Sequence, residues 1–257
     1  MSWLKTLVAV ATLQTLAFTP ALAGDDLDQI RSSGVLKIGT EGTYAPFTFH
    51  DSSNELVGFD VEIGRAVAAK LGVKPEFVEG KWDGLIAGLD AKRYDAVINQ
   101  VGITEARKQK YDFSDPYIVS KAVLIVKEDN TEIKGFEDLK GKKSAQSLTS
   151  NFGKLAEAAG AELVGTDGFD QSIQLVLTGR ADATINDSLS FLDFKKQKAD
   201  APVKIAAEKA EADASGIIVR KGDEELVAAI NKALAEIQAD GTYQAISAKY
   251  FGQDVSK

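Results

Sequence analysis

Residues 94–107 read Tyr-Asp-Ala-Val-Ile-Asn-Gln-Val-Gly-Ile-Thr-Glu-Ala-Arg, and this stretch decides the fold of the chain. Its apolar run, residues 96–98, is typical of a short strand buried on both faces of a parallel sheet, and the polar residues after it mark the strand's carboxyl end. Thr104, with a glutamate behind it, predicts a helix N-cap. Backbone N–H groups and the guanidinium of Arg107 therefore converge where the strand stops. Open α/β sheets bind ligands beyond the carboxyl ends of their strands, so the stretch predicts an anion site at this corner.

Strand and helix patterns alternate on both sides of this stretch, which predicts an α/β architecture. Residues 35–39 and 76–78 are typical of strands. Between them, Asp60 is expected to cap a helix that Gly72 ends. Trp82 is expected to precede the next helix, which leads back into the central strand.

The second half of the chain repeats part of the first. Residues 82–100 align with residues 169–187 at seven identities in nineteen positions. The alternatives are chance and the pattern common to all helix–strand units. If the repeat is real, Gln100 and Asp187 occupy the same place, the tip of a buried strand, in two similar half-structures. Two strand tips that face one cleft would form a two-sided ligand site.

The last third of the chain predicts two lobes, each a mixed sheet with flanking helices. Lobe 1 is discontinuous, with residues 24–120 and 215–257, and lobe 2 comprises residues 121–214. The chain is expected to leave lobe 1 near residues 117–121 and to return near residues 213–216. Two adjacent crossings form a hinge, and a hinge allows closure around a ligand.

Residues 1–23 have the pattern of a secretory signal peptide. Lys5 is an early cation, residues 7–18 are largely apolar, and Pro20 precedes an Ala-Leu-Ala cleavage site that ends at Ala23. The alternative, a transmembrane anchor, needs about 20 apolar residues, and three polar residues interrupt this run. No Cys stands at the cleavage site to accept a lipid. We therefore expect a soluble protein exported to the periplasm.

Composition excludes several classes of function. The 257 residues include 30 Lys and Arg against 38 Asp and Glu, so nucleic acid and anionic membranes are poor partners. The absence of Cys excludes thiol catalysis and Cys-ligated metal. The only histidine, His50, excludes a multi-His zinc site and is expected to be a solvated turn residue. We expect no metal and no cofactor.

Six short motifs follow one another along the chain: residues 35–47, Gly58-Phe59-Asp60, Lys81-Trp82-Asp83-Gly84, Gly102-Ile103-Thr104 with Arg107, residues 111–117, and Gly241-Thr242-Tyr243. Each motif is weak alone, but the ordered set resembles the family 3 solute-binding proteins of polar amino-acid ABC transporters. Residues 41–44, 81–84, 90–93 and 98–101 look most like the cystine-binding members. The resemblance implies a type II periplasmic binding protein, a monomer that closes over an amino acid and hands it to a membrane permease without a reaction of its own.

The resemblance also implies a charge pair for the ligand. Arg107 suits the ligand carboxylate because its planar fork donates two parallel hydrogen bonds, and backbone N–H groups near Gly102 would complete that subsite. Asp187 stands at the family's position for the partner of the ligand ammonium. The alternatives are a surface ion pair for Arg107 and a helix N-cap for Asp187.

Tyr44 and Trp82 stand where the family places aromatic walls over the ligand. For Trp82, core packing is the alternative. Glu41 is placed to reach a cationic ligand group, and a solvated carboxylate is its alternative. Gln100 is expected to bind a polar, distal part of the ligand.

From the second lobe, Gln146, Thr149 and Ser150 match the loop that meets the ligand, with capping of the following helix as the alternative. Two positions depart from the family pattern. Gly102 stands where relatives have Thr or Ser, which leaves extra space for a bulkier ligand, and Leu148 replaces a common Gly.

Cystine is therefore the expected ligand, with arginine, glutamine and other polar amino acids as alternatives. An enzyme on the same fold, a periplasmic dehydratase of the cyclohexadienyl type, is the alternative class. It would need a general acid or base in the cleft, for which Glu41 and Asp187 are the candidates.

Overall fold

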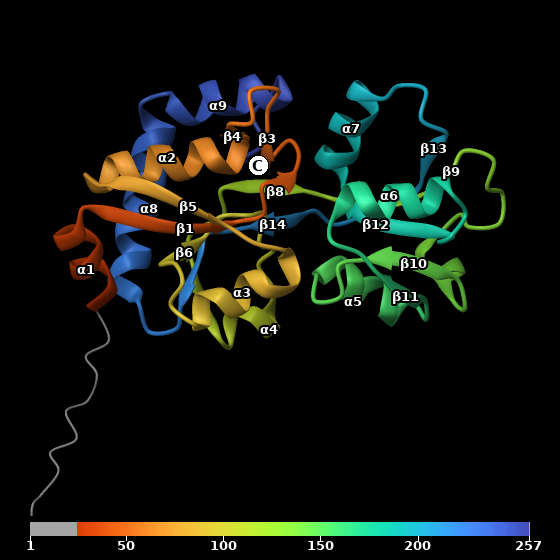
Figure 1. Ribbon diagram of the computed structural model, residues 1–257, viewed down its shortest axis with the longest axis horizontal. Coiled ribbons are helices and arrows are strands. Elements are labelled where there is room, and N and C mark those ends of the chain that lie inside the picture. The colour runs from red at the N-terminus through yellow and green to blue at the C-terminus, as the bar shows by residue number, and fades with distance from the viewer. Residues whose placement is uncertain (1–24, 257) are drawn as a thin grey trace, which may run out of the picture.

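The computed structural model describes residues 25–256 and consists of two lobes side by side, each built on a five-stranded mixed sheet (Figure 1). The predicted signal peptide, residues 1–23, lies outside the described residues. Among the helices within residues 25–256, none is both long and apolar enough to span a bilayer.

The sheet of the first lobe has the strand order β5-β1-β6-β15-β7. Strand β1 pairs in parallel with β5 and β6, whereas β15 pairs antiparallel with β6 and β7. Because β15 comes from near the end of the chain, this sheet combines two segments that are distant in sequence. The strands are β1 (Val35–Thr40), β5 (Lys74–Glu79), β6 (Ala96–Val97), β7 (Tyr111–Phe113) and β15 (Ile218–Arg220).

The central strand β6 is buried on both faces. Ala96 and Ile98 pack into the largest hydrophobic cluster, and Val97 packs on the other face with Leu85 and Leu89. An apolar run without alternation is expected of such a strand, because neither face is exposed to water.

Helices cover both faces of this sheet: α2, α8 and α9 lie on one side, and α3 and α4 on the other (Figure 1). The helices are α1 (Asp25–Ser33), α2 (Phe59–Leu71), α3 (Trp82–Asp90), α4 (Glu105–Lys108), α8 (Glu224–Ala239) and α9 (Thr242–Phe251). Helix α8 buries Leu226, Ile230, Leu234 and Ile237, the spacing of a single helical face. A small sheet joins β2 (Thr43–Tyr44), β3 (Thr48–His50) and β4 (Leu56–Val57).

Two local predictions are wrong. Asp60 does not cap α2, since Gly58 is the N-cap and Asp60 lies fully buried in the first turn. His50 is exposed as expected, but it ends strand β3 opposite Leu56 instead of standing in a turn, with Nε2 3.3 Å from a carboxylate oxygen of Glu79. Asp60 is buried because its partners, Gln100 and Tyr117, are distant in sequence.

The sheet of the second lobe has the order β11-β10-β12-β9-β13, with β10 parallel to its two neighbours and β9 antiparallel to its own. Its elements are β9 (Ala122–Lys127), η1 (Phe136–Leu139), β10 (Lys143–Gln146), α5 (Asn151–Ala158), β11 (Glu162–Gly165), α6 (Phe169–Leu177), β12 (Ala183–Asp187), α7 (Ser188–Gln197) and β13 (Val203–Glu208). Along β9, Leu124 and Val126 pack into one cluster, and Val123 and Ile125 into another. The strand is therefore apolar throughout.

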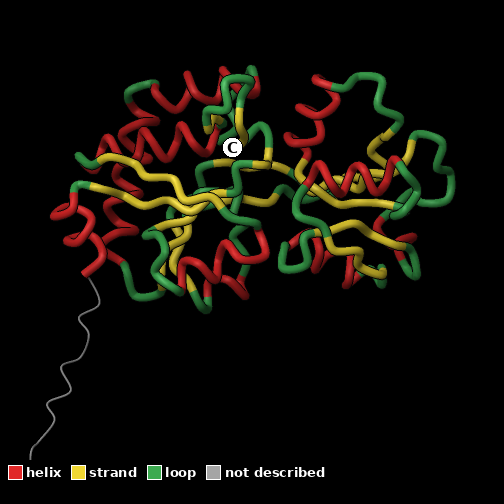
Figure 2. The backbone as a smooth tube through the Cα atoms, viewed as in Figure 1, coloured by secondary structure: helices red, strands yellow, loops and turns green. Residues whose placement is uncertain are grey.

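Two strands connect the lobes. β8 (Ile118–Ser120) and β14 (Asp213–Ser215) pair antiparallel, with Ser120 opposite Asp213 and Ile118 opposite Ser215. Figure 2 shows these two yellow segments running between the sheets. Their positions agree with the two predicted crossings, and their pairing joins them into one ribbon.

Candidate functional site

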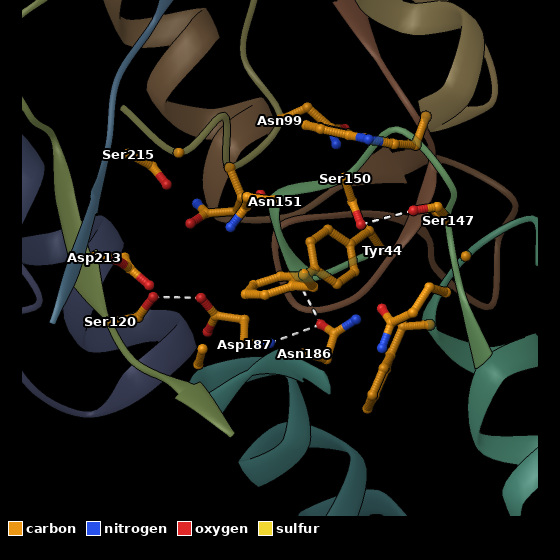
Figure 3. A pocket seen from close by; sticks show the side chains of 18 of the residues that line it. Tyr44, Asn99, Ser120, Ser147, Ser150, Asn151, Asn186, Asp187, Asp213 and Ser215 are labelled. Carbon is orange, nitrogen blue, oxygen red and sulfur yellow. Dashed lines mark hydrogen bonds between the residues drawn. The ribbon is translucent and has the colours of Figure 1, made fainter. Parts of the chain in front are cut away.

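A cavity of roughly 680 Å³, including its opening to solvent, lies between the lobes (Figure 3). Both lobes line it. Of the ten predicted site residues, eight line this cavity: Glu41, Tyr44, Trp82, Gln100, Gly102, Gln146, Ser150 and Asp187. Arg107 lines an adjoining cavity that shares Gly102 with the first, and Thr149 lines neither.

At the tip of β6, Gln100 has a left-handed backbone with φ 52°. Asp60 stabilises this conformation, since it accepts hydrogen bonds from the Gln100 backbone N (2.8 Å), from Gln100 Nε2 (2.8 Å) and from the Tyr117 hydroxyl (3.0 Å). Burial raises the pKa of Asp60 to about 7. The buried Oε1 of Gln100 has no hydrogen-bond partner within the described chain and is available to a ligand. Asp60 is thus a positioning residue for Gln100.

Glu41 is buried beside the same strand tip. Asn99 Nδ2 donates to Glu41 Oε2 (2.5 Å), and Asn99 Oδ1 accepts from the Glu41 backbone N (2.8 Å). Burial raises the pKa of Glu41 to about 7. With 7% of its surface exposed, Glu41 is not the solvated carboxylate of the alternative interpretation.

The two aromatic residues form walls of the cavity. The Tyr44 hydroxyl donates to Asn186 Oδ1 (2.7 Å) across the interlobe gap (Figure 3). Trp82 packs into a core cluster with Leu85, as the alternative interpretation expects, and it also lines the cavity. Its buried indole N–H has no acceptor among residues 25–256.

Arg107 is a buried cation. Thr104 caps its helix as predicted, accepting from the Arg107 backbone N (3.3 Å). The guanidinium carbon lies 5.3 Å from the centre of the Trp82 ring, and Nη1 donates to the Gly102 carbonyl (2.9 Å). Arg107 forms no ion pair with any carboxylate that the structure describes, so the surface ion-pair interpretation is wrong. Burial lowers the Arg107 pKa to about 10. A desolvated guanidinium with free donors is suited to a ligand carboxylate.

Asp187 lies at the opposite strand tip, in the second lobe. Its Oδ1 accepts from the Leu189 backbone N (2.8 Å), which caps α7, and its Oδ2 accepts from Ser120 Oγ. Figure 3 shows Asp187, Ser120 and Asp213 gathered at one end of the cavity. Burial raises the Asp187 pKa to about 6. Asp187 is therefore both an N-cap and a cavity carboxylate. In the described part of the chain, no group of His, Cys, Asp and Glu side chains is arranged to hold a metal ion.

Residues at the end of β10 and in the loop after it make different contacts. Gln146 lines the cavity, and Ser150 both lines it and caps α5 by accepting from the Gly153 backbone N (2.9 Å). Thr149 is exposed, and its backbone N and Oγ1 donate to Asp83 Oδ1 of the other lobe (2.9 and 2.8 Å). In this structure Thr149 therefore contacts the opposite lobe at the rim.

Sequence reasoning missed several residues that line the cavity. For two of them, the internal repeat held a signal: Phe169 aligns with Trp82, and Asn186 aligns with Asn99. Three others belong to the predicted crossings, where polar side chains next to a cleft are informative: Ser120, Asp213 and Ser215. For Asn151 the sequence offered no signal.

The lobes touch at several points around the cavity. Besides the Tyr44 and Asp83 contacts, Ser190 Oγ donates to the Ala45 carbonyl (2.9 Å). Lys81 and Asp167 form an exposed ion pair between the lobes (2.6 Å). These contacts require the two lobes to be closed upon each other.

A family model described as bacterial extracellular solute-binding proteins, family 3, matches residues 36–253. The L-cystine-binding protein TcyA of Bacillus subtilis is 50% identical over 235 residues, which cover 91% of this chain and 87% of the relative.

Two solved structures report on the closure. An ancestral arginine-binding protein bound to arginine has 44% identity and a TM-score of 0.80, covering 85% of this chain and 99% of its own. The L-cystine solute receptor of Neisseria gonorrhoeae, in the unliganded open conformation, has 49% identity but a TM-score of only 0.60. The match covers 91% of this chain and 100% of the receptor. Higher identity with lower similarity in shape is expected when the lobes, and not their folds, differ in arrangement. The present structure thus has the closed arrangement.

Proposed function

Because this chain belongs to the bacterial extracellular solute-binding proteins of family 3, we propose that it is a periplasmic amino-acid receptor that delivers L-cystine to the permease of an ABC transporter. The observation that supports this most is the placement of opposite charges. Arg107, a buried cation without a carboxylate partner in the described chain, comes from one lobe, and the buried carboxylate of Asp187 comes from the other. An amino acid is the ligand that bridges such a pair.

In this proposal Arg107 and the backbone near Gly102 bind the ligand carboxylate, and Asp187 binds the ammonium. Reaching the ligand requires the guanidinium to turn from the Gly102 carbonyl toward the main cavity, which adjoins its own cavity at Gly102. Tyr44 and Trp82 cover the aliphatic part. The remaining predicted residues bind polar groups of the ligand: Glu41, Gln100, Gln146 and Ser150. Thr149 acts at the rim, through its contact with Asp83.

Closure would occur by rotation of the lobes about β8 and β14. We keep the predicted boundaries, with residues 24–120 and 215–257 in lobe 1 and residues 121–214 in lobe 2. Since each lobe holds one member of the charge pair, the ligand stabilises the closed arrangement in preference to the open one. The receptor acts as a monomer, and no reaction follows binding.

Cystine leads because of the likeness to TcyA and because Gly102 leaves space beside Arg107. Native mass spectrometry of the purified protein, followed by a thermal-shift screen of amino acids, tests the assignment. Cystine should raise the melting temperature, and reduction to cysteine should cancel most of the shift. A larger shift from arginine or glutamine would overturn cystine as the ligand and leave the receptor function intact. Turnover of any component of a mixed metabolite pool would overturn the receptor function itself.

A further inference from the structure

A second cavity adjoins the main one. It holds roughly 880 Å³, including its opening to solvent, and is lined mainly by α4 with the residues before it and by α5, together with Lys209, which follows β13. Five residues line both cavities, so the two adjoin each other: Gly102, Ala122, Asn151, Phe152 and Asp213. A ligand longer than a single amino acid would pass between these residues to occupy both.

Gly102 lies at this junction. A Cβ atom built there would lie 3.5 Å from Arg107 Nη1 and 3.6 Å from Asn151 Nδ2, which is ordinary contact distance. Its φ lies outside the left-handed region, so the backbone does not require glycine. The absence of a side chain here keeps a group out of the junction between Arg107 and Asn151.

The walls of the second cavity are charged. Lys154 of α5 lines it and forms no ion pair with any described residue. Lys209 lines it as well and lies 2.9 Å from a carboxylate oxygen of Asp213, which borders both cavities. Arg107 lines this cavity as well. Cations and a carboxylate that line one cavity complement a carboxylate and an ammonium of a ligand.

We propose that the second cavity is the subsite for the distal half of an elongated ligand with two amino-acid groups. Lys154 and Lys209 bind the distal carboxylate, Asp213 binds the distal ammonium, and Gly102 leaves the passage open. This inference rests on the proposed function, which places the proximal half between Arg107 and Asp187. It explains how a site built for one amino acid discriminates cystine from its half.

The test uses calorimetry of the full mature protein with three probes. L-Cystine and diaminopimelate each have two amino-acid groups, whereas S-methyl-L-cysteine represents one half of cystine. The double variant Lys154→Met/Lys209→Met should bind both long probes at least tenfold more weakly and S-methyl-L-cysteine within twofold of wild type. Lys196→Met, an exposed lysine of α7 away from both cavities, is the matched control and should change nothing.

Unchanged affinity of the double variant for the long probes would overturn the distal subsite while leaving the receptor function in place. An equal loss for long and short probes would overturn it too, because it would indicate a general effect on closure. If the wild type binds S-methyl-L-cysteine but neither long probe, the distal subsite and the cystine assignment both fall, and the amino-acid receptor function stands. If the wild type does not bind S-methyl-L-cysteine, the long probes alone are compared. A loss of at least tenfold in the double variant, with Lys196→Met unchanged, supports the distal subsite, and an equal affinity of the two variants overturns it. Circular dichroism of each variant verifies that it is folded.

Discussion

The two lobes build the tips of their central strands from nearly the same sequence and use them differently. In lobe 1, Asp95 Oδ2 accepts from the Lys37 backbone N (2.9 Å). In lobe 2, Asp182 Oδ2 accepts from the Lys143 backbone N in the same way (2.7 Å). The aligned asparagines, Asn99 and Asn186, both lie at the cavity. The repeat seen in the sequence is thus matched by a structural one.

The tips diverge at the residue that follows the asparagine. After Asn99, Gln100 turns into the left-handed region and is held by the buried Asp60. After Asn186, Asp187 opens helix α7 and leaves its carboxylate in the cavity. The strand tip of lobe 1 therefore presents a neutral amide that Asp60 holds in place, and the strand tip of lobe 2 presents a charge. Two similar strand tips therefore form two different subsites, because the residue after the asparagine differs and so does the group that holds it in place.

The largest effect is expected from the charge pair. Arg107→Ala or Asp187→Asn should weaken ligand binding by roughly 2 to 5 kcal/mol, because each leaves a ligand charge desolvated without its partner. Asparagine is chosen at position 187 because it preserves the N-cap of α7 while removing the charge. Calorimetry measures the loss, and circular dichroism verifies the fold. A variant within about threefold of wild type, less than ~1 kcal/mol, would refute its assigned role.

Asp60 should matter to stability as well as to the site, since no equivalent carboxylate supports Asp187 in the second lobe. Asp60→Ala leaves the Gln100 backbone N–H, the Gln100 amide and the Tyr117 hydroxyl without their acceptor. We expect a loss of about 2 to 3 kcal/mol in the free energy of unfolding, measured with urea. Asp182→Ala, which removes a single exposed bond, is the control and should cost less than about 1 kcal/mol. An equal loss of unfolding free energy in the two variants would mean that the three hydrogen bonds of Asp60 stabilise the protein no more than the single bond of Asp182.

Binding should weaken in acid through the carboxylate of the second lobe. The Asp187 pKa of about 6 in the closed arrangement without ligand lies above its usual value because the carboxylate is buried, and a ligand ammonium requires the ionised form. Affinity should be constant at high pH and fall as the pH drops through about 6, by about tenfold at one unit below the pKa. Asp187→Asn should bind weakly at every pH, with most of this dependence gone. A wild-type affinity that is flat from pH 8 to 5 would contradict the assignment. Glu41→Gln separates the contribution of Glu41, whose pKa is about 7.

The smallest effect is expected at the rim. Asp83→Ala removes the acceptor of the Thr149 backbone N–H and hydroxyl from the opposite lobe, so the closed form should lose about 1 kcal/mol. We expect a dissociation rate several-fold faster by stopped-flow fluorescence, with little change in association. Lys81→Ala, which removes the exposed pair with Asp167, should remain within about twofold. If both variants release ligand at the same rate, the hydrogen bonds between Thr149 and Asp83 do not stabilise the closed form.

The sequence by itself determined the central strand, the internal repeat, the two lobes and the candidate pair Arg107 and Asp187. These follow from local rules: an apolar run indicates burial on both faces, Thr104 indicates a helix start, and polar residues after a strand indicate a site. Only the tertiary structure decided that Asp60 supports Gln100, and that Thr149 meets Asp83 across the lobes. Those partners lie 40 and 66 residues apart, so no local pattern predicts them. A buried strand or a helix cap is set by neighbours in sequence, whereas a buried polar group such as the Gln100 amide needs a partner that folding brings from elsewhere.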